Sequence, residues 1–145
     1  KGPDSFFCDR CKSLQEAEKV TLLKTLPRFL TVHLKRFKYD ERIKGLSKIT
    51  WQVAFPLQLK LKTVLQPPSV EHDNKGETYL YRLVGIIVHI GQGNKHGHYI
   101  SIARISNRWV QFNDDDIELV DEHMLEKLFG SRGSNYCAYM LFYER

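Results

Sequence analysis

The sequence predicts an α+β fold built on an antiparallel sheet. Several short segments have the alternating or apolar pattern of strands, and polar stretches containing glycine or proline separate them. Only one segment, after Asp121, has the spacing of a clear amphipathic helix. Many strands with a single clear helix are typical of this class. The chain of 145 residues, 42% of them hydrophobic, has the size and apolar content of one ordinary domain.

The first part of the chain is predicted to contain a short helix and two strands. Residues 13–16, with the sequence SLQE, match a capping box, so a helix is expected to begin there. Residues 29–39 alternate between apolar and polar side chains, which indicates a strand. Residues 40–47 are polar and are expected to form a loop. Residues 50–55 indicate a second strand, which ends at Pro56.

The second part of the chain is predicted to contain four strands and the clear helix. Polar residues 66–77 and glycine-rich residues 91–97 are expected to be loops on either side of a long apolar strand. Asp121 can cap a helix of about two turns, and Gly130 can end it. The expected strands are residues 79–90, 99–105, 108–112 and 136–143, and the apolar residues of the helix are Met124, Leu125, Leu128 and Phe129.

The net charge of +5 does not by itself identify a partner. Residues 35–44 interleave basic and aromatic side chains, as some nucleic-acid-binding surfaces do. Strand alternation, however, places Lys35 and Phe37 on one side and Arg36 and Lys38 on the other, which divides this patch. We therefore expect no nucleic-acid partner. No apolar run approaches the ~18–20 residues that a membrane span needs, so we expect no membrane partner.

The three cysteines indicate a reducing compartment, because their number is odd and the first residues lack a secretory-signal pattern. We therefore expect a cytoplasmic or nuclear protein. Cys8 and Cys11 form a CxxC pair, which can chelate one zinc ion through a tight turn, although a structural zinc site needs four ligands. Two free thiols are the alternative. A redox pair is disfavoured because no βαβ pattern precedes it.

A histidine and an asparagine have a spacing that favours contact between them. If Ser106 and Asn107 form a two-residue hairpin turn, His98 and Asn113 share one face as diagonal neighbours about 7–8 Å apart. On this register Asp114 points to the opposite face. An amide oxygen that accepts the Nδ1–H of an imidazole holds the ring as a general base requires. The pattern is also compatible with an ordinary histidine on a sheet edge.

Seven motifs in order resemble the C-terminal part of the catalytic domain of ubiquitin-specific proteases. The resemblance implies a papain-like cysteine protease fold with thumb, palm and fingers. Residues 1–20 would be the end of the fingers with half of a zinc knuckle, residues 21–145 would be an antiparallel-sheet palm, and the thumb would be absent from this chain. The motifs are FFCDRC, LQEAEK, LPRFLTVHLKRFKYD, VAFPLQL, YRLVGIIVHIGQGNKHGHYISI, RWVQFNDDDI and YCAYMLFYE, from about residue 6 to 144.

The resemblance also implies an activity and the residues that perform it. The activity is deubiquitination, the hydrolysis of the peptide or isopeptide bond after the C-terminal glycine of ubiquitin. His98 would be the base, Asn113 would orient it, and Asp114 would assist. Residues 40–47 and 91–97 would flank the ubiquitin tail. The residues expected to line the tail channel are Phe37, His89, Gly97 and Tyr99.

The nucleophile of this family does not occur within the chain. The family carries it in a box of the Gly-Asn-Thr-Cys type, and no such box is present. Cys137 lies in the middle of an apolar strand, while Cys8 and Cys11 match the fingers. We therefore expect the nucleophilic cysteine on a segment outside residues 1–145, and we expect residues 1–145 alone to be inactive. In relatives a second CxxC completes a four-cysteine zinc site, so Cys8 and Cys11 would be half of it.

The expected partners are ubiquitin and ubiquitinated proteins, with an activating scaffold protein as a further candidate. A catalytically inactive ubiquitin-binding or scaffold module is the alternative function. The presence of both His98 and Asn113 argues against this alternative, because binding alone requires neither residue.

Overall fold

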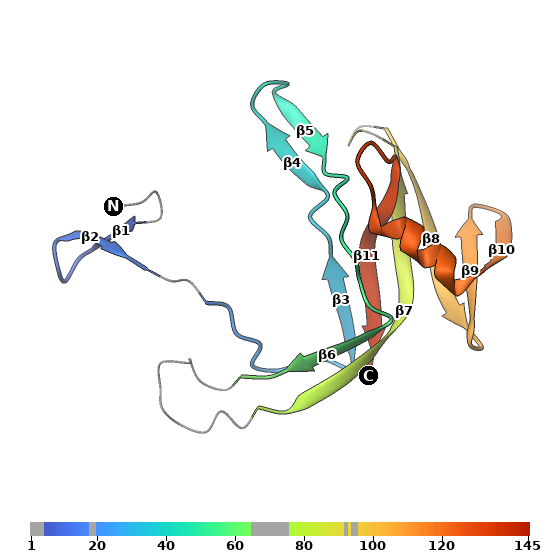
Figure 1. Cartoon of the computed structure of the whole chain (residues 1–145), viewed down its shortest axis with the longest axis horizontal. Coiled ribbons are helices and arrows are strands. Elements are labelled where there is room, and N and C mark those ends of the chain that lie inside the picture. The colour runs from blue at the N-terminus through green and yellow to red at the C-terminus, as the bar shows by residue number, and fades with distance from the viewer. Residues whose placement is uncertain (1–4, 18–19, 65–75, 92, 94–95) are drawn as a thin grey trace. The chain divides into compact units, whose positions relative to one another are not determined.

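The computed structural model describes residues 5–17, 20–64, 76–91, 93 and 96–145 (Figure 1). The chain divides into two compact units, one of residues 1–25 and 63–77 and the other of residues 26–62 and 78–145. The assignment of residues 1–20 to fingers and 21–145 to a palm stays a prediction. Among the described residues, no helix has the length and apolar character needed to cross a membrane.

The first unit contains an antiparallel hairpin of β1 (Ser5–Cys8) and β2 (Ser13–Glu16). The helix expected at residues 13–16 is therefore wrong. The Ser13 hydroxyl accepts a hydrogen bond from the side-chain amide of Gln15, at 2.8 Å, instead of capping a helix. The turn at residues 9–12 returns the chain so that cross-strand pairing replaces the local capping pattern.

The second unit is built on an antiparallel sheet with the strand order β10-β9-β8-β7-β11-β3, and β6 also pairs with β7 (Figure 1). This sheet, with one helix among the described residues, confirms the predicted α+β class. Its strands are β3 (Phe29–His33), β6 (Gln58–Lys62), β7 (Thr78–Ile90), β8 (His98–Ile105), β9 (Arg108–Asn113), β10 (Asp116–Val120) and β11 (Tyr136–Glu144).

The core lies where β7, β8 and β11 meet the helix. Tyr81, Leu83 and Val88 of β7 have no exposed surface. The predicted helix forms as the 3-10 helix η1 (Glu122–Phe129), which buries Leu125 and Leu128 against this core. The expected capping by the side chain of Asp121 does not occur. Burial of the apolar face therefore stabilises η1 more than its cap does.

Several expected element boundaries between residues 34 and 62 are wrong. The strand expected at residues 29–39 is interrupted after β3, and β4 (Phe37–Asp40) pairs with β5 (Gly45–Lys48) as a hairpin. The loop expected at residues 40–47 thus includes most of β5. Residues 50–55 form no strand, and β6 and β10 were not expected.

Arg36 explains why residues 34–36 and 50–55 leave the strand conformation. Its side chain is only 2% exposed, and its guanidinium donates to the carbonyl oxygens of Ala138 (3.1 Å), Trp51 (2.6 Å) and Phe129 (2.9 Å). The backbone N–H of Val53 also donates to Phe129 O, at 2.9 Å. Backbone groups that would otherwise form the hydrogen bonds of a β-sheet are thus bound to the side chain of Arg36 and to the end of η1.

Replacing Arg36 with methionine should lower the free energy of unfolding by roughly 3–5 kcal/mol, because three carbonyl oxygens lose a charged donor inside the fold. Urea denaturation of the full-length protein, followed by tryptophan fluorescence, measures the change. The matched control is Lys35→Met at the exposed neighbouring position, where a change within about 0.5 kcal/mol is expected. Equal unfolding midpoints for the two variants would contradict this role of Arg36.

Candidate active site

The β8–β9 hairpin has the register that the sequence predicts. Ile105 pairs with Arg108, and the ladder continues to the pair of Ser101 with Phe112. Between the strands lies a two-residue turn, in which Ser106 has φ 46° and Asn107 has φ 68°. Two consecutive residues with positive φ form the turn type that suits the twist of a hairpin. The turn therefore fixes which side chains of β8 and β9 share a face.

His98 and Asn113 are brought into direct contact by this register. His98 Nε2 lies 2.6 Å from Asn113 Oδ1, which confirms that the two side chains share a face. The ring nitrogen is Nε2, so the expectation that Nδ1 would be bound is wrong. Because a carbonyl oxygen can only accept, Nε2 carries the hydrogen and Nδ1 of the neutral ring holds the free lone pair. The His98 side chain remains 44% exposed.

Asp114 does not point to the opposite face as strand alternation predicts. Its φ of 52° places it in the turn between β9 and β10, where alternation no longer applies. Its Oδ2 lies 3.8 Å from His98 Nε2, which is too long for a hydrogen bond but close enough for electrostatic attraction to a protonated ring. The side chain of Asp114 is 80% exposed, so water and salt weaken this attraction.

Two of the expected channel residues, Phe37 and Tyr99, lie around the ring of a third, His89. Its centroid lies 4.9 Å from that of Tyr99, 5.4 Å from that of Phe37 and 6.5 Å from that of Tyr139. His89 is 2% exposed, and its Nδ1 is buried without a hydrogen-bond partner among the described residues. Burial lowers the pKa of His89, and the charge of Lys48 lowers that pKa further, so the ring is neutral at pH 7.

The sequence reasoning missed Tyr139. Besides His89, its ring contacts Tyr99 and Phe37. The centroid of the Tyr139 ring lies 5.9 Å from that of Tyr99 and 6.0 Å from that of Phe37. A register shift between Ala138 and Met140 interrupts the pairing of β11 with β7 at this residue. Such a bulge changes the direction of a side chain, so the alternation of β11 carries no signal for it.

The fourth channel residue, Gly97, lies against the same ring. A Cβ atom at this position would lie 2.2 Å from His89 Nε2 and 2.9 Å from the carbonyl oxygen of Ile90. Both distances are shorter than any ordinary contact, so only glycine fits the present arrangement. The backbone of the segment before β8 can thus approach His89 closely. Residues 92, 94 and 95 of the expected loop at 91–97 lie outside the described residues.

Cys8 and Cys11 lie together on the β1–β2 hairpin of the first unit. Hydrogen bonds from the backbone N–H groups of Cys11 and Arg10 to the Cys8 sulfur lower the pKa of the Cys8 thiol, and the side chain of Cys11 adds to this effect. Within the described part of the chain, no group of three or more His, Cys, Asp or Glu residues could hold a metal ion. Cys137 is fully buried in β11.

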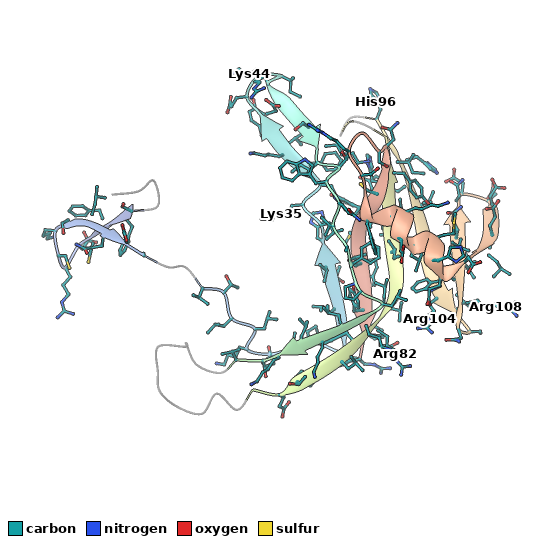
Figure 2. All side chains as sticks on the ribbon, viewed as in Figure 1. Lys35, Lys44, Arg82, His96, Arg104 and Arg108 are labelled. Atoms are coloured by element: carbon teal, nitrogen blue, oxygen red, sulfur yellow. The ribbon has the colours of Figure 1, made fainter. Side chains whose placement is uncertain are left out.

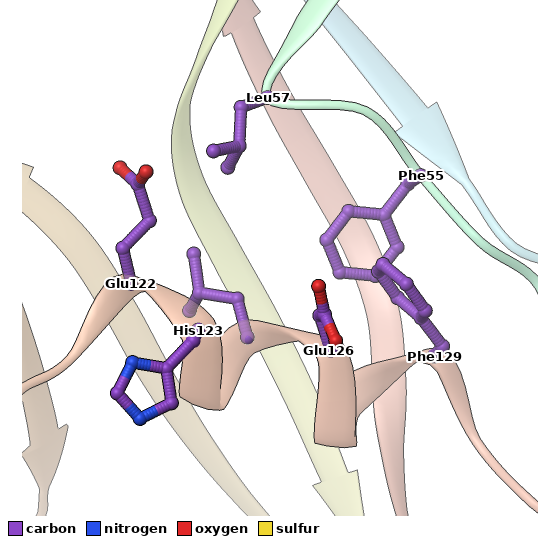
Figure 3. A pocket seen from close by; sticks show the side chains of 7 residues that line it. Phe55, Leu57, Glu122, His123, Glu126 and Phe129 are labelled. Carbon is purple, nitrogen blue, oxygen red and sulfur yellow. The ribbon is translucent and has the colours of Figure 1, made fainter.

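Two other features of the second unit lie away from His98. Figure 2 shows Lys35 at the junction of β3 and β4 and Lys44 at the tip of the β4–β5 hairpin, so the basic residues of this segment are spread along it. A pocket of about 300 Å³ lies beside η1 (Figure 3), and it includes none of the expected site residues. Its lining residues are Phe55, Leu57, Glu122, His123, Leu125, Glu126 and Phe129.

Known relatives share nearly the whole of this chain. It is 40% identical over 147 residues to "ubiquitin carboxyl-terminal hydrolase 4" of Arabidopsis thaliana, and 42% identical over 142 residues to "probable ubiquitin carboxyl-terminal hydrolase creB" of Aspergillus flavus. Both alignments cover 97% of this chain but only 38% and 18% of the relatives. The chain therefore spans well under half of the length of these relatives.

Solved structures share its fold. The Ubp8/Sgf11/Sus1/Sgf73 DUB module of SAGA bound to ubiquitin aldehyde matches with a TM-score of 0.69 and 28% identity, over 99% of this chain and 30% of that chain. A module with altered Ubp8 and Sgf11 matches with a TM-score of 0.72 and 30% identity, over 96% and 28%. The family model described as ubiquitin carboxyl-terminal hydrolase matches residues 5–143. The chain belongs to the ubiquitin carboxyl-terminal hydrolase family and forms part of a ubiquitin-specific protease domain.

Proposed function

We propose that the protein containing this chain is a thiol-dependent deubiquitinase in which His98 is the base and Asn113 orients it. The hydrolysed bond would be the peptide or isopeptide bond after the C-terminal glycine of ubiquitin. The observation that carries the proposal is the 2.6 Å contact between His98 Nε2 and Asn113 Oδ1. It supports the role because it leaves Nδ1 of a half-exposed ring available for proton transfer.

The proposed reaction follows from this arrangement of the ring. His98 Nδ1 takes the proton of a cysteine thiol, and the thiolate attacks the carbonyl carbon of the terminal glycine of ubiquitin. The protonated ring then donates its proton to the leaving amine, which produces a thioester. Water attacks the thioester, His98 takes the proton of that water, and the thiolate leaves as ubiquitin is released. Throughout, Asn113 Oδ1 accepts the Nε2–H and holds the ring plane.

The two side chains beside the imidazole have different roles in this proposal. Asn113 is neutral, so it orients the ring without adding a second negative charge next to the thiolate. Asp114 stabilises the protonated ring weakly from 3.8 Å. Asp114 would also cover part of the loss if Asn113 were removed.

We propose that Phe37, His89, Gly97 and Tyr99 line the channel for the ubiquitin tail. Tyr99 offers a side chain that is 52% exposed, which is an aromatic surface for the extended tail. Gly97 presents backbone without a side chain, so a second backbone can approach it. The buried His89 would support the floor of the channel through its contacts with Phe37 and Tyr99.

The proposed reaction also requires a thumb and a nucleophilic cysteine. We propose a papain-like domain whose thumb and nucleophilic cysteine lie outside residues 1–145, so that residues 1–145 alone are inactive. The match covers 38% and 18% of the two relatives, which leaves room for both. The SAGA module, in which Ubp8 is found with Sgf11, Sus1 and Sgf73, supports a scaffold protein as a partner. The proposed location is cytoplasmic or nuclear.

We propose that Cys8 and Cys11 hold a structural zinc ion together with two ligands from outside residues 1–145. Two sulfurs on one tight turn are the donor set that zinc prefers. The backbone N–H groups that lower the pKa of the Cys8 thiol favour the thiolate that a metal requires. The ion would crosslink the hairpin to another segment and would take no part in the reaction.

Substitution of His98 with alanine should abolish hydrolysis of a ubiquitin C-terminal fluorogenic substrate by the full-length protein, with ubiquitin affinity nearly unchanged. Asn113→Ala should lower kcat by about 10- to 1,000-fold, because the ring is then free to turn. The double variant Asn113→Ala with Asp114→Ala should be slower still. Undiminished turnover in His98→Ala would exclude His98 from the mechanism. Binding without turnover in the unmodified protein would favour the inactive ubiquitin-binding module.

Replacing Cys8 and Cys11 with serine should reduce the zinc content of the full-length protein from about one ion per chain to none, and should lower the thermal midpoint. Metal analysis after exhaustive desalting measures the content. Cys137→Ala is the control that keeps the ion. Zinc-free unmodified protein, or a double variant that keeps its zinc, would show that the pair consists of ordinary thiols.

A further inference from the structure

Lys48, at the end of β5, binds three backbone carbonyl groups with its one ammonium group. Its Nζ lies 3.1 Å from His89 O, 2.7 Å from Gly91 O and 2.8 Å from Asn135 O. An ammonium group has three hydrogens, so each of these three carbonyl groups can accept one, and the side chain of Cys137 also interacts with the ammonium group. The three oxygens come from the end of β7, from the residue after it and from the residue before β11. Lys48 thus connects the β4–β5 hairpin to two other segments.

Two of the carbonyl groups that Lys48 binds, those of His89 and Gly91, lie on either side of Ile90. Ile90 is the last residue of β7, and in the β7–β8 ladder it pairs with His98. On its other side Ile90 pairs with Tyr136 of β11. The backbone N–H of Gly91 donates to Asn135 O, at 2.8 Å, so this oxygen accepts from both Gly91 and Lys48. Lys48 of the β4–β5 hairpin therefore holds the backbone that pairs with His98.

We propose that Lys48 is a positioning residue for His98. It holds the end of β7 in place and thereby sets the position of the imidazole relative to the nucleophile. This inference rests on the proposed function, because it assigns Lys48 a role in the reaction of His98. Nothing in the proposed chemistry requires Lys48 to touch ubiquitin or the reacting atoms.

Lys48 adds hydrogen bonds to a region that aromatic contacts of Phe37 also connect to β7 and β11. The space beside Lys48, between the hairpin and the segments that follow β7 and precede β11, is a pocket of about 550 Å³. An open pocket supplies little packing, so the hydrogen bonds of Lys48 and the ring contacts of Phe37 with His89 and Tyr139 connect the hairpin to β7 and β11.

Lysine suits these three acceptors better than arginine does. An ammonium group directs its hydrogens in three dimensions, whereas a guanidinium directs them in one plane. Arginine would keep the charge and part of the hydrogen bonding. Methionine would keep the aliphatic stem and lose all three hydrogen bonds. Comparison of lysine, arginine and methionine at this position therefore separates the hydrogen bonds from the packing of the stem.

The test uses the full-length protein and a ubiquitin C-terminal fluorogenic substrate. For Lys48→Met, kcat should fall about 10- to 100-fold while KM stays within about threefold, because a small misplacement of a catalytic group affects the chemical step. The acid limb of the kcat/KM profile should also move to higher pH, since a displaced imidazole stabilises the thiolate less. Lys48→Arg should recover part of kcat. Lys60→Met, at an exposed position of β6, is the matched control.

A kcat and an acid limb for Lys48→Met equal to those of Lys60→Met would overturn the proposal. If Lys48→Met does not fold, as judged by circular dichroism, Lys48→Arg decides. A kcat for a folded Lys48→Arg that is lower than that of Lys60→Met, with an acid limb moved to higher pH, would then support the proposal, and unchanged exchange at His98 in Lys48→Arg together with full kcat would overturn it.

Amide hydrogen exchange separates this inference from the proposed function, because it needs no turnover. The amide of His98 should exchange at least about tenfold faster in Lys48→Met than in Lys60→Met, while amides in the centre of β7 keep their protection. An unmodified protein without hydrolase activity would end the proposed function. Unchanged exchange at His98 would end the role of Lys48 even in an active enzyme.

Discussion

The register of the β8–β9 hairpin is the constraint on which the candidate site depends. Two consecutive residues with positive φ, Ser106 and Asn107, close the hairpin and thereby fix which residues of β8 and β9 pair. A slip of one residue would turn Asn113 to the other face of the sheet, and the imidazole of His98 would lose the amide that orients it. The geometry of the candidate site is thus decided at an exposed turn about eight residues from His98.

Features with local causes could be predicted from the sequence, and features with distant causes could not. The contact of His98 with Asn113 follows from a short hairpin and strict alternation, and both signals lie within one stretch of chain. The side on which Asp114 lies, and the contacts of Tyr139, depend on a turn and a bulge that interrupt alternation. The choice of Nε2 over Nδ1 depends on the rotation of the ring, which has no pattern in the sequence.

Two cations of the second unit bind backbone carbonyl groups, and one of them, Arg36, is buried while Lys48 is half-buried. Arg36 binds three such groups and draws residues near Trp51 and Phe129 out of any ladder. Lys48 binds three others around the end of β7. A buried charge is costly unless its donors are satisfied, so Arg36 requires carbonyl oxygens from several segments. The sequence gives no sign of such binding, because a basic residue in a strand pattern indicates an exposed position.

The uncharged, buried His89 has a consequence for the behaviour of the fold in acid. Its pKa lies below the ordinary value of 6.5, chiefly because burial removes it from water, while in the unfolded chain it titrates normally. Unfolding therefore takes up a proton as the pH falls below about 6.5, and the free energy of unfolding decreases. The native fold around His89 is therefore expected to lose stability on mild acidification.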